Sequence, residues 1–204
     1  MSRLAAPTLF ALALLSSIAS AGTVEGRVGV GVRGLDLASV APVIVFLAPE
    51  DDATPLRTEG LPPVTITQRN ARFEPGFAVV VVGQRLEMPN FDGFFHNVFS
   101  FSRPNDFDLG VYASGEARSI VFEHAGLVRL YCSIHESMSG LVLVVPSKAW
   151  SRVETDGRFS IPRIPPGRYR ITAWSEQLPP ITTSIAVGND PGPSLELLLG
   201  ATKP

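Results

Sequence analysis

The sequence predicts an all-β protein that contains two β-sandwiches. Short β-branched and aromatic runs alternate with turns, and 18 glycines and 18 prolines in 204 residues fit a fold with many turns. No stretch keeps the 3.6-residue apolar period of an amphipathic helix. The strand-like runs are Val43–Leu47, Ala78–Val82, Val98–Phe101, Ser119–Phe122, Leu127–Tyr131, Leu141–Val145, Gly157–Ile161 and Tyr169–Trp174. Turn signals such as Pro165-Pro166-Gly167 separate these runs.

The first 21 residues have the layout of a cleaved secretory signal. A basic residue, Arg3, precedes an apolar run over Leu9–Leu15, and the segment ends on Ala19-Ser20-Ala21. The run is too short to span a bilayer, and no later segment is long and uncharged enough to do so. We therefore expect a protein that is exported to the periplasm, has no membrane span and loses residues 1–21.

Charge and cysteine content narrow the classes of function. The formal net charge of −2 does not provide the positive charge that binds nucleic acid, so the sequence does not indicate a nucleic-acid-binding protein. The single cysteine, Cys132, has no partner for an intramolecular disulfide. In an oxidising compartment such a residue is a buried inert thiol, half of an intermolecular disulfide, or a metal ligand. The neighbours of Cys132 favour the third interpretation.

Three potential metal ligands lie in one short segment between two strand-like runs. Cys132, His135 and Met138 follow the spacing C-x2-H-x2-M, and a second imidazole, His96, stands at the start of an earlier strand. Two imidazoles, a thiolate and a weak axial thioether form the ligand set of blue copper sites. The sequence thus predicts one type 1 copper held by these four side chains. The remaining histidine, His124, falls at a turn away from this segment and is interpreted as a surface residue.

At these residues the chain resembles the cupredoxins, and its ligand-loop spacing is similar to that of amicyanin in particular. The resemblance covers about residues 64–146 and includes an F-x-P stretch, a V-G-x turn, an N-x-D segment and an H-N-V sequence. These are Phe73-Glu74-Pro75, Val82-Gly83-Gln84, Asn90-Phe91-Asp92 and His96-Asn97-Val98. The resemblance implies a Greek-key β-sandwich and a copper that exchanges electrons with redox protein partners. It also implies that His135 is the outer ligand, near the surface.

The resemblance gives roles to residues that are not ligands. Asn97 corresponds to an asparagine that hydrogen-bonds across to the ligand loop, and Ser133 to a position whose hydroxyl often pairs with it. Glu136 stands where amicyanin-like loops often carry proline, so a charge is expected near the electron exit. Phe94 and Phe95 fit either a core or an apolar rim around the copper, and the sequence leaves both interpretations open.

The flanks of the copper-binding segment resemble a different module. Asp156–Ile161 and Pro165–Tyr169 follow the D-G-x-F-x-I and P-P-G-x-Y pattern of the carboxypeptidase-regulatory or transthyretin-like β-sandwich. Gly22–Val28 is similar to the opening strand of that module, and Ala41–Ala48 to its second strand. We therefore expect one sandwich split by an inserted cupredoxin. The expected division is a signal peptide at 1–21, an accessory sandwich made of 22–57 and 151–204, and a cupredoxin domain at 60–146.

Three classes of function are compatible with a copper site of this kind. An electron carrier needs only one type 1 copper and a redox protein partner. A copper storage or delivery module usually carries many methionines or histidines, whereas this chain has three of each. A multicopper oxidase or a nitrite reductase subunit needs further copper sites and more histidines. We therefore expect a one-electron carrier rather than an enzyme, with copper storage or delivery as the alternative.

Overall fold

The computed structural model describes residues 21–50, 56, 60–188 and 194–201. In these ranges every regular element is a β-strand, which confirms the predicted all-β class. None of the described residues form a helix long and apolar enough to cross a membrane. The predicted signal segment lies outside the described residues, apart from Ala21. The strands are β1 (Gly22–Val30), β2 (Ile44–Pro49), β3 (Val64–Thr65), β4 (Thr67–Arg69), β5 (Arg72–Glu74), β6 (Phe77–Val81), β7 (Arg85–Pro89), β8 (His96–Ser100), β9 (Phe107–Tyr112), β10 (Ala117–Val121), β11 (Gly126–Tyr131), β12 (Ser139–Val145), β13 (Trp150–Arg152), β14 (Arg158–Ile164), β15 (Gly167–Trp174), β16 (Ile181–Val187) and β17 (Leu195–Leu199).

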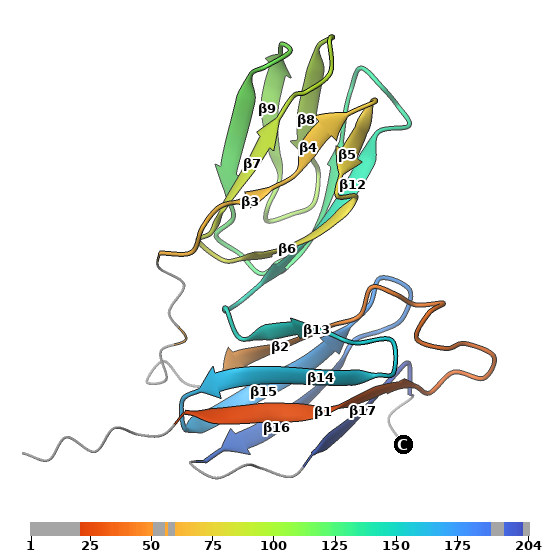
Figure 1. The fold of residues 1–204 in the computed structure, drawn as a ribbon, viewed down its shortest axis with the longest axis vertical. Coiled ribbons are helices and arrows are strands. Elements are labelled where there is room, and N and C mark those ends of the chain that lie inside the picture. The colour runs from red at the N-terminus through yellow and green to blue at the C-terminus, as the bar shows by residue number, and fades with distance from the viewer. Residues whose placement is uncertain (1–20, 51–55, 57–59, 189–193, 202–204) are drawn as a thin grey trace, which may run out of the picture.

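Strands β3–β12 form the sandwich in the upper half of Figure 1. One sheet has the strand order β10-β7-β3, with the β4–β5 hairpin against β7, and the other has the order β6-β12-β11-β8-β9. Successive side chains of a strand point to opposite faces, so alternate residues enter the space between the sheets. Leu86 and Met88 from the first sheet and Val128 and Val142 from the second are fully buried in that core.

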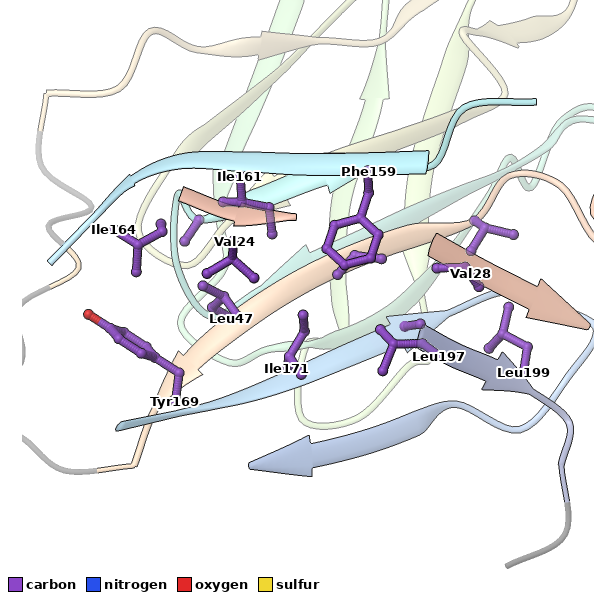
Figure 2. Close-up of a cluster of buried hydrophobic side chains, with 14 of the residues drawn as sticks. Val24, Val28, Leu47, Phe159, Ile161, Ile164, Tyr169, Ile171, Leu197 and Leu199 are labelled. Atoms are coloured by element: carbon purple, nitrogen blue, oxygen red, sulfur yellow. The ribbon is translucent and has the colours of Figure 1, made fainter. Parts of the chain in front are cut away.

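The remaining strands form a second sandwich, called here the accessory sandwich. Its sheets have the orders β14-β1-β17 and β13-β2-β15-β16. Figure 2 shows the core between them, where Val24 and Phe159 from one sheet face Leu47 and Ile171 from the other. Strand β1 pairs with β14 antiparallel and with β17 parallel, and β2 pairs with both β13 and β15. Strands that precede and follow residues 64–145 are therefore hydrogen-bonded in the same sheets.

An apolar cluster joins the two sandwiches. On β12, Val142 and Val144 point into the core of the β3–β12 sandwich, whereas Leu143 and Val145 belong to the cluster between the sandwiches. Ile44 of β2 enters the same cluster from the accessory sandwich. Both faces of β12 are thus buried, which is the physical reason for its continuous apolar run. The rings of Phe77 and Trp174 stack within this cluster with their centroids 5.9 Å apart.

The sheet order brings two chain segments together at one end of the β3–β12 sandwich. Strand β11 lies between β8 and β12, and it pairs antiparallel with both. The first residue of β8 and the loop that joins β11 to β12 therefore meet at the same sheet edge. In Figure 1 this loop lies at the end of the sandwich away from the accessory sandwich.

Candidate metal centre

Three of the four predicted ligands converge at this edge. His96 is the first residue of β8, Cys132 directly follows β11, and His135 lies in the loop to β12. The Cys132 Sγ lies 3.7 Å from His96 Nδ1 and 3.8 Å from His135 Nδ1. The ligand atoms of the three side chains all lie within 4.8 Å of one another. His124 is not in this group; it is exposed, and its backbone oxygen accepts a hydrogen bond from Asn105.

The fourth predicted ligand, Met138, lies in the same loop and is 1% exposed. Its backbone N–H donates to the His135 oxygen over 2.9 Å, and its own backbone oxygen accepts from the Cys132 N–H over 3.3 Å. The loop is thereby closed upon itself by main-chain hydrogen bonds. Met138 and Cys132 belong to one buried cluster, so the thioether is shielded from water. Its role as an axial ligand stays a prediction.

An asparagine ties β8 to the ligand loop. The Asn97 Oδ1 accepts a hydrogen bond from the backbone N–H of Ser133 over 3.1 Å. The Asn97 Nδ2 donates to Asp108 Oδ1 over 2.7 Å, which fixes the orientation of the amide. The structure thus contains the cross-loop hydrogen bond that the family resemblance implies for Asn97. The donor in this hydrogen bond is the backbone of Ser133 rather than its hydroxyl.

The buried histidine has a carboxylate partner that the sequence analysis missed. His96 is 0% exposed, and its Nε2 lies 2.8 Å from Asp92 Oδ2. Burial alone would raise the pKa of Asp92, but hydrogen bonds from the Ala71 backbone and from the His96 ring, among others, outweigh it. The pKa of Asp92 is therefore lowered from its ordinary value. In the sequence, Asp92 is part of the N-x-D family motif, and the spacing of that motif does not indicate a contact with His96.

Apolar side chains surround the exposed side of the cluster. The Phe94 ring centroid lies 5.1 Å from the ring centroid of His96 and 5.1 Å from that of His135. Phe94 is 45% exposed and Phe95 is 58% exposed, so both belong to the surface rather than to the core. Ile134 is exposed in the ligand loop itself, and the next residue, His135, is half-buried. The exposure of both phenylalanines excludes the core, and the ring contacts of Phe94 place that residue at the rim of the cluster.

The two sulfur–nitrogen distances in the cluster fit a single metal ion. Zinc, a comparable first-row ion, lies about 2.3 Å from sulfur and about 2.0–2.1 Å from imidazole nitrogen. With bond angles near 120°, these lengths place sulfur and nitrogen about 3.7–3.8 Å apart. The sulfur–nitrogen distances here are 3.7 and 3.8 Å. A thiolate with two imidazoles and a nearby thioether is also the donor set that copper prefers.

Comparisons with known proteins give matches to parts of the chain. The family model described as polysaccharide lyase family 4, domain II, matches residues 149–192. No curated protein matches the chain. Among solved structures, a purple cupredoxin from Nitrosopumilus maritimus is 26% identical over 41% of this chain and 98% of its own, with a TM-score of 0.36.

Two further solved structures have similar scores. A copper-containing nitrite reductase from Thermus scotoductus SA-01 is 27% identical over 48% of this chain and 27% of its own, with a TM-score of 0.39. An amicyanin variant with Cu(I) is 21% identical over 41% of this chain and 82% of its own, also with a TM-score of 0.39.

Proposed function

We propose that this chain is an exported protein that binds one type 1 copper and carries single electrons between redox protein partners. The observation that carries the proposal is the convergence of His96, Cys132 and His135, whose ligand atoms lie within 4.8 Å of one another. Met138, buried in the same loop, would supply the weak axial thioether. Bound copper would supply the one-electron Cu(II)/Cu(I) couple.

The surroundings of the ligands favour electron transfer because they resist rearrangement. Copper prefers different geometries in its two oxidation states, so a scaffold that limits movement lowers the reorganisation energy. The loop is closed by the main-chain contacts of Met138, and Asn97 ties it to β8. His96 and Cys132 are both buried within the sandwich. These contacts would keep the three ligand side chains in nearly the same positions with Cu(I) and with Cu(II).

The proposed electron exit is the ring of His135. This imidazole is half-buried, and the apolar side chains of Phe94 and Ile134 are exposed beside it. An apolar surface of this kind lets a partner protein approach closely and exclude water. We propose no enzymatic activity for the chain, since electron exchange at this surface needs only the one copper.

The accessory sandwich is proposed to be a structural module of the transthyretin-like type. The support for this assignment is the pattern of Asp156–Ile161 and Pro165–Tyr169 together with the pairing of β1 with β14. The buried cluster of the accessory sandwich contains aliphatic and aromatic residues. The accessory sandwich would serve as a structural support for the β3–β12 sandwich.

The decisive experiment is a Cu(II) titration of purified protein followed by visible absorption. We expect one copper per chain and an intense thiolate-to-copper charge-transfer band. Cys132→Ala should abolish the band, and His135→Ala should abolish or strongly change it. His124→Ala is the matched control, since this histidine is exposed and outside the cluster, and it should leave the band intact.

Three outcomes would contradict the proposal. Stoichiometric Cu(II) binding without the charge-transfer band would exclude a type 1 site. Tight binding of zinc in preference to copper would indicate a structural metal site instead. A coloured protein that exchanges no electrons, and readily gives copper to a chelator, would favour the alternative of copper storage or delivery.

A further inference from the structure

The Asp92 carboxylate and the Cys132 sulfur lie next to the two different nitrogens of the His96 ring. Asp92 Oδ2 is 2.8 Å from Nε2, whereas Cys132 Sγ is 3.7 Å from Nδ1. A neutral imidazole carries a proton on one nitrogen and a lone pair on the other. Because a carboxylate accepts hydrogen bonds, this contact favours the tautomer that is protonated at Nε2. The lone pair of Nδ1 then faces the other donor atoms of the cluster.

The carboxylate is itself held in place by a hairpin turn. Asp92 Oδ1 accepts from the backbone N–H of Asn70 over 2.6 Å, and Oδ2 accepts from that of Ala71 over 2.9 Å. These two residues form the turn between β4 and β5, and both have positive φ, 54° and 52°. The two N–H groups point outward from the turn to the same acceptor. Rotation of the Asp92 side chain away from His96 would break both hydrogen bonds.

The backbone on both sides of Asp92 is fixed by a buried asparagine. Asn90 is 0% exposed, and its Oδ1 accepts from the Asp92 N–H over 2.9 Å. The Asn90 Nδ2 donates to the Phe94 oxygen over 2.8 Å. The short segment from Asn90 to His96 is thus held from inside, and the carboxylate, 7% exposed, has little room to move.

We propose that Asp92 is a positioning residue, which fixes both the ring orientation and the tautomer of His96 so that Nδ1 is ready to bind copper. The consequence for copper rests on the proposed function, but the tautomer is a property of the metal-free protein. Carboxylate partners of metal-binding histidines also raise the basicity of the ring, and their loss costs about 10–100-fold in metal affinity. The same negative charge favours Cu(II) over Cu(I).

The first test uses metal-free protein with ¹⁵N-labelled histidine, examined by NMR. In the wild type we expect the shifts of His96 to show a proton on Nε2 and a lone pair on Nδ1. Asp92→Asn should lose this preference and give a mixture of tautomers. Asp106→Asn, which removes the same charge at an exposed position, is the control and should leave His96 unchanged. A wild-type His96 protonated at Nδ1 would overturn the proposal even if Asp92→Asn failed to fold.

The second test uses the copper-loaded proteins. Relative to Asp106→Asn, we expect Asp92→Asn to bind Cu(II) about 10–100-fold more weakly and to have a higher reduction potential. An affinity and a potential equal to those of the control would overturn the positioning role. Failure of the proposed function is a different result: wild-type protein would then lack the charge-transfer band, while the tautomer measurement would still decide the role of Asp92.

Discussion

Leu143 provides a quantitative test of how firmly the two sandwiches are joined. Its side chain is 3% exposed and packs in the apolar cluster that also contains Ile44 of the accessory sandwich. Leu143→Ala removes buried methyl groups and leaves a cavity between two sheets that are each held by their own core. Such a change costs about 2–5 kcal/mol of the free energy of unfolding.

A polar contact between the same two sandwiches serves as the comparison. Arg129 Nη1 of β11 lies 2.9 Å from Glu176 Oε1, but the two side chains are 48% and 30% exposed. An ion pair this exposed contributes about 0–1 kcal/mol, because solvent screens it and both side chains lose conformational freedom. The apolar cluster should therefore contribute more than this ion pair to joining the sandwiches.

Thermal unfolding followed by circular dichroism measures the difference. For a protein of this size, 1 kcal/mol shifts Tm by about 2–4 °C. We expect Leu143→Ala to lower Tm by about 4–20 °C and Glu176→Gln by at most about 4 °C. Leu143→Ala should not alter the Cu(II) spectrum, because its side chain points away from the core that contains Cys132. A smaller loss for Leu143→Ala than for Glu176→Gln would refute this account of the interface.

Three other predictions concern the ligands, the rim and the accessory sandwich. Met138→Leu should keep copper and colour while raising the reduction potential in voltammetry, and loss of copper binding would make Met138 a principal ligand. Phe94→Lys should slow electron exchange with a partner in stopped-flow measurements and leave the spectrum unchanged; an unaffected rate would place the electron exit elsewhere. A fragment of residues 151–204 should stay unfolded by circular dichroism, because β14 and β17 pair through β1 rather than with each other. Cooperative folding of that fragment would disprove the split accessory sandwich.

Strands with strong apolar runs were predictable because burial itself dictates their composition. The predicted runs Val43–Leu47 and Leu141–Val145 overlap β2 and β12. The same pattern could not say what covers the second face of each strand, which is the cluster between the sandwiches. The two-residue strand β3 was not predicted, since it is too short for a periodic pattern and is defined by its pairing with β7. The division into domains stays a prediction, to be tested with the fragment.

The proximity of the Cys132 and His135 side chains was predictable because both lie in one short loop. The spacing C-x2-H-x2-M limits how far apart Cys132, His135 and Met138 can lie, whatever the fold. The contact of Asp92 with His96 was not predictable in this way. It depends on the loop conformation that Asn90 imposes and on two N–H groups of a hairpin distant in sequence. No periodicity in the sequence encodes such an arrangement.

The unequal exposure of the two imidazoles determines how a metal ion would reach the cluster. His96 is fully enclosed, whereas His135 is half-buried at the surface next to Phe94. An electron can tunnel through packed side chains, whereas an ion must reach its ligands from solvent, and of the three clustered side chains only His135 is not buried. Metal loading and partner docking would then compete for one surface. A docked partner would protect bound copper from chelators, so exchange of the ion should be slowest while electrons are being transferred.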